Sequence, residues 1–285
     1  MKQITNRTTL ALNSRILSKK MEKFAEKRPA WFLCVILSFM LLVASSRELF
    51  AFRPFETEDA AVVDNGDVEL EFGFSINEQK QKIGDEVTID MPIVSLTFGL
   101  PYDIELSADL TMEFVDEDQG DGFHSTLEQL TGAGLNVKKV WMRGKGIIPD
   151  IATQTSILFP TEKRARGVDI EHSFIYTWKL PNLLFHTTIG GGSEHVDEED
   201  MEKDVRGRYF YGSILDYNLP LQGNNYHLVA EYFAERTINE PLEHQMLIGT
   251  TIDLPKNIKG DFAVFWGLNH QSIDRGATFG VTIGW

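Results

Sequence analysis

Two stretches of the chain alternate apolar and polar residues without interruption. Residues 67–76 (DVELEFGFSI) place a large apolar side chain at every second position, and residues 104–114 (IELSADLTMEF) repeat the pattern. Successive side chains of an extended chain point to opposite sides, so each stretch would have one apolar face and one acidic face. A period of two over this length predicts a β-strand.

The same alternation continues along the sequence and predicts ten further strands, with no convincing helix between them. They lie near residues 88–100, 134–142, 150–159, 168–179, 183–190, 208–217, 226–236, 245–254, 261–269 and 278–285. The sequence therefore predicts an all-β protein of about twelve strands.

The connections between these strands are of two kinds that alternate. Four of them contain Leu-Pro (LPYD, LPN, NLPLQGNN and LPKNIKG) and a fifth is RGKG, whereas the others are mostly longer and charged, as in residues 115–132 and 194–207. A soluble sandwich with Greek-key links gives no reason for such alternation. A transmembrane up-and-down antiparallel β-barrel explains the alternation, because it has turns at one end and loops at the other.

The last predicted strand carries its large side chains on one face, at Phe279, Val281, Ile283 and Trp285. Because no backbone group can stay unpaired in a bilayer, we expect this strand to pair with residues 67–76 and close the barrel. Alternating apolar residues before a terminal aromatic resemble the C-terminal assembly signal of outer-membrane barrels. An even strand number places both strand ends on the periplasmic side.

Aromatic residues also occur near the ends of the apolar faces, as expected for the belts at a membrane interface. They are Phe74, Phe98, Phe114, Tyr176, Trp178, Tyr217, Tyr232, Trp266 and Trp285.

The N-terminal residues 1–51 differ in composition from the rest of the chain. They hold nine Lys or Arg against three Glu, followed by the apolar run WFLCVILSFMLLVA and small residues. This order predicts a cleaved secretory signal peptide, with an uncleaved anchor helix as the alternative. The chain carries −15 and this leader +6, so the remainder would carry −21, and it would lose Cys34, the only cysteine.

We therefore expect three parts: a signal peptide (1–51), a periplasmic or plug segment (52–66) and an outer-membrane barrel (67–285). The middle part could hang in the periplasm or enter the barrel, and the sequence does not choose between the two.

Three short stretches resemble the outer-membrane transporters of the phenol-degradation meta-pathway family. They are FRPFETEDAAVVDNGDVELEFGF, with Arg53-Pro54, Thr57-Glu58-Asp59-Ala60 and Gly66, then ILFPTEKRARG, and the closing FWGLNHQSIDRGATFGVTIGW. The chain departs from that family in ending on Trp rather than Phe. The resemblance implies an outer-membrane barrel that passes small, often aromatic, compounds.

If the apolar faces meet lipid, the acidic faces line the lumen. The inward carboxylates would be Asp67, Glu69, Glu71, Glu105, Asp109, Glu113, Glu171 and Glu231. So many carboxylates cannot all ionise in a dry core, so either water fills the lumen or basic groups pair with them. Arg208, Lys138 and Lys179 are too few for full pairing. We expect a wetted, cation-preferring lumen, with an internal salt-bridge network as the alternative.

Another class of function is suggested by His270 and Ser272 in NHQSIDRG. This pair is similar to the His-x-Ser of the outer-membrane phospholipase, and alternation would place it on the lipid-facing side of strand 261–269. A serine nucleophile needs a base and a third group that orients it, and no third group is identifiable. A lipid-facing hydrolase and a non-conducting structural barrel remain alternatives to the channel.

The remaining motifs predict no catalytic or metal site and no cofactor. The acidic run 115–122 lacks the EF-hand order, so solvated charge is favoured over loose divalent binding, and the other histidines lack metal-ligand spacing. Nucleic-acid binding does not suit so acidic a chain. The expected partners are outer-membrane lipids, lipopolysaccharide, the barrel-assembly machinery and a small-molecule solute, in the outer membrane of a Gram-negative bacterium.

Overall fold

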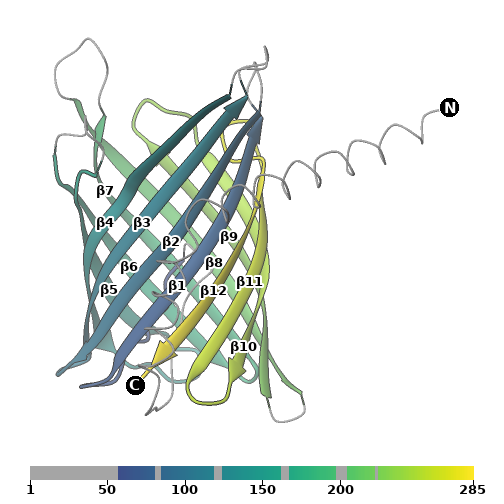
Figure 1. Cartoon of the computed structure of the whole chain (residues 1–285). Coiled ribbons are helices and arrows are strands. Elements are labelled where there is room, and N and C mark those ends of the chain that lie inside the picture. Colours follow the sequence, from purple (N-terminus) through teal and green to yellow (C-terminus); the bar gives the residue numbers. More distant parts are fainter. Residues whose placement is uncertain (1–56, 81–84, 119–123, 162–166, 197–203, 222–223) are drawn as a thin grey trace. The chain divides into compact units, whose positions relative to one another are not determined.

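The computed structural model describes residues 57–80, 85–118, 124–161, 167–196, 204–221 and 224–285. These residues form twelve strands: β1 (Val68–Lys80), β2 (Asp85–Leu100), β3 (Ile104–Asp118), β4 (His124–Met142), β5 (Asp150–Leu158), β6 (Asp169–Leu180), β7 (Leu183–Val196), β8 (Asp204–Leu221), β9 (Asn224–Thr237), β10 (Glu243–Leu254), β11 (Ile258–Gly267) and β12 (Arg275–Gly284). Each strand pairs with the next in sequence and β12 pairs with β1, so the sheet is a closed barrel (Figure 1). The predicted fold is confirmed. No helix among the described residues is long and apolar enough to cross a membrane.

The barrel closes where the first and last strands were expected to meet. β1 and β12 run antiparallel with Phe72 opposite Val281 and Phe74 opposite Phe279. At the chain end the Val68 N–H donates to the carbonyl of Trp285 at 2.9 Å, and the Trp285 N–H donates back at 3.0 Å. Because of this pairing the barrel has no free strand edge.

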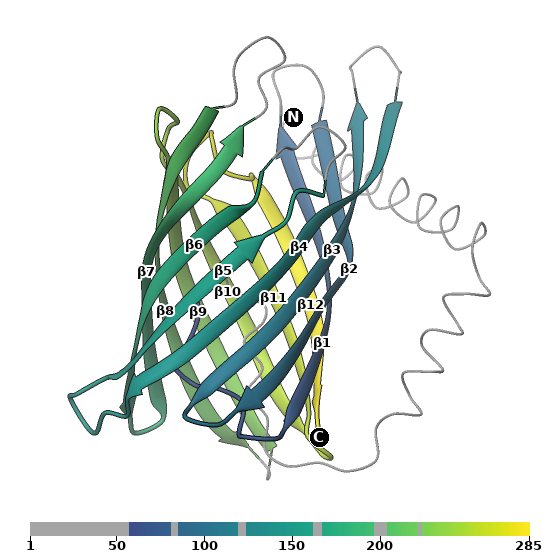
Figure 2. The same ribbon diagram turned by 90° about the vertical axis from the view of Figure 1, so that its left-hand side faces the viewer.

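One end of the barrel, which we call the short-turn end, carries the compact connections and the start of β1 (Figure 2). Tyr102 and Asp103 between β2 and β3, and Lys256 and Asn257 between β10 and β11, all have positive φ. Two consecutive residues with positive φ match the right-handed twist of hairpin strands, which explains such tight turns. The opposite end is the loop end.

At the loop end the strands are longer than predicted. Residues 115–132 were expected to form a loop, yet β3 continues to Asp118 and β4 begins at His124. Similarly, β1 extends to Lys80 and β2 begins at Asp85. The ends of β1 and β3 are mostly polar, and the β3–β4 pairing shifts its register between Thr111 and Met112, so the period-two signal disappears although backbone pairing continues.

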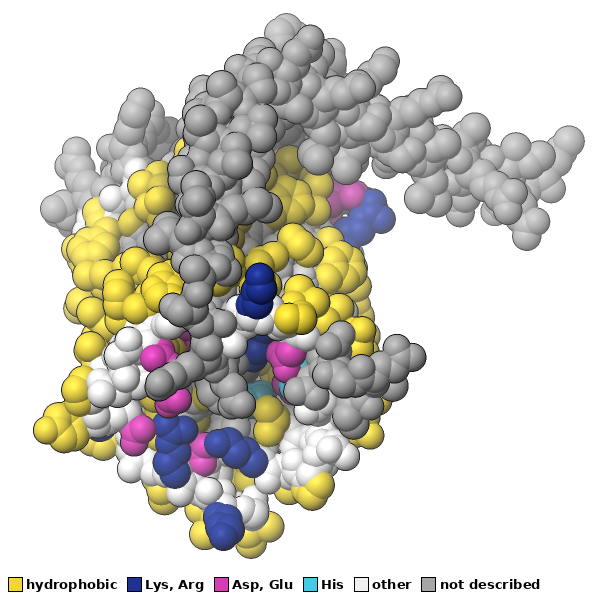
Figure 3. Space-filling model, turned by 60° about the horizontal axis from the view of Figure 1, so that its bottom comes forward, with side chains coloured by type: hydrophobic (Ala, Val, Ile, Leu, Met, Phe, Trp, Pro, Cys, Tyr) yellow, Lys and Arg dark blue, Asp and Glu magenta, His cyan; other side chains and the backbone are white. Residues whose placement is uncertain are grey.

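The two faces of the wall differ as the alternation requires. In β6, Phe174 is 46% exposed on the outside, whereas Ile175 is fully buried inside. Large apolar side chains are exposed along the outer wall, and on the face shown in Figure 3 the charged side chains collect toward the barrel end.

Candidate functional site: the acidic lumen and its inner segment

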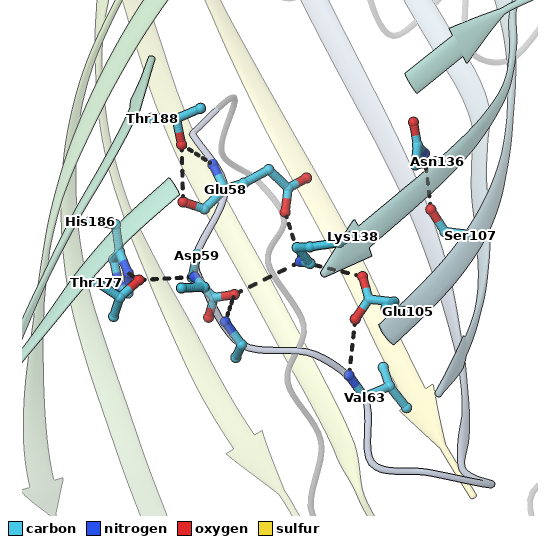
Figure 4. A network of polar contacts seen from close by, with 12 residues as sticks. Glu58, Asp59, Val63, Glu105, Ser107, Asn136, Lys138, Thr177, His186 and Thr188 are labelled. Carbon is cyan, nitrogen blue, oxygen red and sulfur yellow. Dashed lines mark hydrogen bonds and ion pairs between the residues drawn. The ribbon is translucent and has the colours of Figure 1, made fainter. Parts of the chain in front are cut away.

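Residues 57–66, which we call the inner segment, enter the barrel at the short-turn end, and residues 57–63 lie inside it (Figure 4). Thr57 and Ala60 are fully buried. The segment leaves the lumen through a turn at Gly66, whose φ is +92° and whose N–H donates to the carbonyl of Gly99 at 3.0 Å. The positive φ favours glycine here. The described part of the segment that we expected to hang free or plug the barrel is thus inside it.

The inner segment has no strand partner, so side chains of the wall satisfy its backbone. The Thr57 N–H donates to Glu231 Oε1 at 2.6 Å, and the Ala60 N–H donates to Thr177 Oγ1 at 2.9 Å. Thr188 binds Glu58 twice, accepting from its N–H and donating to its carbonyl oxygen, both at 3.2 Å. Buried backbone groups are costly unless paired in this way.

Lys138 of β4 joins the inner segment to the wall through its charge. Its ammonium nitrogen lies 3.2 Å from Glu58 Oε2, 3.3 Å from Glu105 Oε1 and 4.0 Å from Asp59 Oδ1. Glu105 also accepts the Val63 N–H at 2.9 Å with its other oxygen. A lysine side chain only 6% exposed is tolerated because carboxylates surround its ammonium group. We call this group the Lys138 clamp.

The clamp also sets the ionisation of Glu58. Burial in the lumen raises the pKa of the Glu58 carboxyl above its ordinary value. The Lys138 ammonium opposes this increase in pKa, and the carboxylates of Glu105 and Asp59 add to it.

The wall is shaped to receive the inner segment at two glycines. A Cβ on Gly99 would lie 2.0 Å from the Asp64 carbonyl oxygen, and one on Gly212 would lie 1.9 Å from Thr57 Oγ1. Any larger residue at either position would displace the segment.

Apolar contacts complete the docking of the segment. Ala60 and Val62 form a buried cluster with Val140 of β4, Ala152 of β5 and Ile175 of β6. The short-turn half of the lumen therefore contains a small buried apolar cluster beside its polar contacts.

Beyond the inner segment the lumen holds a cavity of about 590 Å³. Nine carboxylates line it: Glu58, Asp59, Glu69, Glu71, Asp90, Glu105, Asp109, Glu235 and Glu243. Lys138 and Arg208 are the two Lys or Arg side chains among its lining residues. Apolar side chains, including Phe233, Leu247 and Phe265, complete the lining.

Both cations of the lining are already engaged by carboxylates. Arg208 Nη1 lies 2.7 Å from Glu171 Oε1, and its Nε donates to Glu235 Oε2 at 3.1 Å. Lys179, the third basic residue expected to balance the lumen, instead binds Asp150 at 2.7 Å and is half exposed. The described cavity lining therefore has a large excess of negative charge.

Six of the residues predicted for the lumen line the cavity: Glu69, Glu71, Glu105, Asp109, Lys138 and Arg208. Glu171 contacts Arg208, and Glu231 holds the inner segment. Glu113 continues the row of Glu105 and Asp109 toward the loop end, outside the cavity lining. Asp67 lies in the turn before β1 and is not among the lining residues.

The alternation failed to identify Asp90 as a lumen residue for a specific reason. Ile93 and Ser95 of β2 line the cavity, so an unbroken period of two would turn Asp90 outward. A bulge between Asp90 and Ile93 shifts the register, and Asp90 accepts a hydrogen bond from Ser75 Oγ at 2.6 Å inside the barrel. The alternation does predict that Glu235 faces the lumen, because it lies four residues after the inward Glu231 on the same face of β9.

The predicted lipid-facing placement of Ser272 is wrong. β11 ends at Gly267, so its alternation does not extend to residue 272. Ser272 is buried and lines the cavity, with its Oγ 2.6 Å from Asn269 Oδ1 and 2.9 Å from the carbonyl oxygen of His244. No hydrogen bond joins it to the exposed His270 among the described residues, so nothing here favours a hydrolase.

Two other predictions concern metal and the N-terminus. No group of three or more His, Cys, Asp or Glu in the described ranges is arranged to hold a metal ion. The predicted signal peptide, Cys34 and the first residues of the segment 52–66 lie outside the described residues. The C-terminal assembly signal lies on β12 and at Trp285, and its role stays a prediction.

No known family model matches the sequence, and no curated protein matches it. Solved structures do share its fold. An outer membrane channel from Pseudomonas putida F1 has a TM-score of 0.61 and 7% identity over 81% of this chain and 100% of that chain. The β domain of the Bordetella autotransporter BrkA has a TM-score of 0.52 at 12% identity, over 78% of this chain and 100% of its own. The translocator domain of NalP from Neisseria meningitidis has a TM-score of 0.51 at 12% identity, over 76% of this chain and 87% of its own.

At these identities the likeness establishes the fold alone, which is that of outer-membrane β-barrels. The resemblance to the phenol-degradation transporter family stays a prediction.

Proposed function

We propose that this protein is a channel of the bacterial outer membrane that passes small molecules passively and prefers cations. The observation that carries the proposal is the cavity itself, which nine carboxylates line against two cationic side chains. A closed antiparallel barrel with a hydrophobic outer surface supports the membrane location.

The preference for cations follows from the cost of ionising many carboxylates close together. Like charges raise one another's pKa unless water or counter-ions screen them. Lys138 and Arg208 already contact carboxylates, and a lining in which acids outnumber Lys and Arg side chains favours cations over anions. Rings of acidic side chains give cation channels their selectivity in this way.

The lining also limits the class of solute. Phe233, Leu247 and Phe265 add apolar surface beside the acids. Small cations, and small compounds that combine a positive group with an apolar part, fit both features. This class is compatible with the aromatic compounds that the family resemblance suggests only where they also carry positive charge.

The inner segment lies between the cavity and the short-turn end, which we propose faces the periplasm. Passage through the barrel then requires a solute to pass beside the segment or the segment to move. Its attachment through one clamp, a few side-chain hydrogen bonds and a small apolar cluster supports a plug that can be displaced.

The test is the conductance of the folded protein in a planar bilayer under a salt gradient. We expect discrete openings whose reversal potential lies toward the cation equilibrium value. The double variant Glu71→Gln with Asp109→Asn should move the reversal potential toward zero, because both carboxylates line the cavity away from the clamp.

Asp103→Asn is the matched control, since Asp103 is an exposed acid in a turn outside the lumen and should leave selectivity unchanged. Anion-selective openings would refute the cation preference. Silence of both the wild type and a variant lacking the inner segment would instead support a non-conducting barrel.

A further inference from the structure

One turn at the short-turn end presents large apolar side chains that nothing on the barrel covers. The turn joins β4 to β5 and extends outward from the wall (Figure 2). Ile147 is 88% exposed and Ile148 54%, while the neighbouring aromatic residues Tyr102 and Trp141 are 84% and 67% exposed. Together with Lys139, Arg143 and Lys145 we call these residues the turn patch.

The turn holds a defined shape through its own contacts. The Gly144 N–H donates to Asp150 Oδ1 at 2.6 Å, and the Ile148 N–H donates to the carbonyl of Lys145 at 3.3 Å. A Cβ on Gly144 would lie 2.1 Å from the Ile148 carbonyl oxygen, so the loop closes tightly only with glycine there. The two isoleucines are therefore held away from the barrel by a built turn.

Trp141 is fixed on the outer wall beside this turn. Its indole N–H donates to Thr153 Oγ1 of β5 at 2.9 Å, which leaves the ring exposed. The Lys139 ammonium lies 5.6 Å from the centre of that ring and donates to the carbonyl oxygen of Tyr102. A lysine whose stem lies along an apolar wall while its charge reaches the barrel end is typical of a membrane interface.

The charge of the patch is opposite to that of the molecule. The chain carries a net charge of −15, yet the patch contains three cations. The acid in contact with them is Asp103, whose Oδ1 lies 3.1 Å from Arg143 Nη2. Arg143 is nevertheless 46% exposed, and Lys145 is exposed.

We infer that the turn patch binds an anionic phospholipid in the leaflet at the short-turn end. The phosphate would contact Arg143 and Lys145, while Trp141, Ile147 and Ile148 would pack against the apolar part of the lipid at the edge of the leaflet. Clusters of cations beside apolar and aromatic side chains recognise anionic lipid by this combination of charge and insertion. The inference goes beyond the proposed function, because it concerns the outer wall and not conduction.

The test is native mass spectrometry of the folded, delipidated protein, titrated in a neutral detergent with phosphatidylglycerol or phosphatidylcholine. We expect tighter binding of phosphatidylglycerol. Each cation near an anionic surface contributes about a fivefold change in affinity, so Arg143→Gln with Lys145→Gln should weaken binding roughly 25-fold. Ile147→Ser with Ile148→Ser should weaken the binding of both lipids.

Lys256→Gln is the matched control, since Lys256 is an exposed cation in the β10–β11 turn of the same end. It should leave the affinity for phosphatidylglycerol unchanged, and Asp103→Asn should not reduce it. The inference is overturned if phosphatidylglycerol binds no better than phosphatidylcholine, or if the Arg143/Lys145 variant binds like the wild type. Conductance measured on the same samples separates this result from the channel proposal.

Discussion

The two halves of the lumen are built on different principles. In the half that holds the inner segment, Ala60 and Ile175 are fully buried, and the Lys138 ammonium lies within 4.0 Å of three carboxylates. Away from the Lys138 clamp, six further carboxylates line the cavity, with Arg208 as the Lys or Arg side chain among those lining residues. The first half resembles the interior of a soluble domain and the second a solvated surface turned inward, so a substitution should have opposite consequences in each.

The largest effect should come from Lys138→Met. The change leaves Glu58, Asp59 and Glu105 close together in the lumen without their cation, which breaks a buried ion pair. We expect a loss of roughly 3 kcal/mol, the lower part of the usual range because Glu58 keeps some solvent contact. Urea unfolding would measure the loss, and faster cleavage after Glu58 by a glutamate-specific protease would report release of the segment.

Lys179→Met is the control for that experiment. Lys179 also forms an ion pair, with Asp150, but it is half exposed and does not contact the inner segment. Its removal should leave cleavage after Glu58 unchanged. Equal cleavage of the Lys138 variant and the wild type would show that the clamp does not hold the segment.

The next effect should come from Gly99→Ala. The added methyl group would lie 2.0 Å from the Asp64 carbonyl oxygen and 2.5 Å from that of Val63, so the inner segment must shift. Overpacking of this kind costs about 1–3 kcal/mol. The protease assay should detect the shift, and conductance should rise if the segment limits flow.

Gly260→Ala supplies the same chemical change on β11, where a Cβ meets nothing within 4 Å. It should behave like the wild type in both assays. A Gly99 variant indistinguishable from the Gly260 variant would mean that the segment is not pressed against the wall.

A comparable loss of stability, with a change of selectivity, is expected in the cavity. Arg208→Gln removes the guanidinium between Glu171 and Glu235, so the lining becomes more negative. The loss of charged hydrogen bonds should cost about 1–3 kcal/mol, but cation selectivity should increase. Reversal potentials would then shift away from zero, whereas Glu71→Gln with Asp109→Asn shifts them toward zero. A shift in the same direction for both variants would contradict an electrostatic origin.

Much of this architecture could be predicted from the alternation alone. The pairing of Phe74 with Phe279 and the inward rows of Glu69, Glu71, Glu105 and Asp109 follow from a period of two. The period says nothing where a strand is polar on both faces or ends early, so the loop-end strand lengths and Ser272 were predicted wrongly.

The role of Lys138 had a different obstacle. The sequence identifies it as an inward cation, but its partners Glu58 and Asp59 lie about 80 residues away on a segment with no strand pattern. Only the folded chain brings a non-repetitive segment into a lumen, through contacts such as that of Thr57 with Glu231. The turn patch could not be predicted for the same reason. It combines the β2–β3 turn with the β4–β5 turn, and these turns lie about 40 residues apart in the sequence.

The smallest effect should come from Glu58→Gln, and its sign follows from the raised pKa of Glu58. An acid whose pKa is higher in the folded state stabilises that state below its unfolded pKa, about 4.3, and loses the contribution as pH rises through the folded value. In the wild type, the melting temperature should therefore have a component that falls as pH increases above about 4.3. The glutamine variant should lack it, while its stability at neutral pH changes by less than about 1 kcal/mol, since the carboxylate is partly exposed. A loss at pH 7 as large as that of Lys138→Met would instead mean that the ionised Glu58 is the main attachment of the segment.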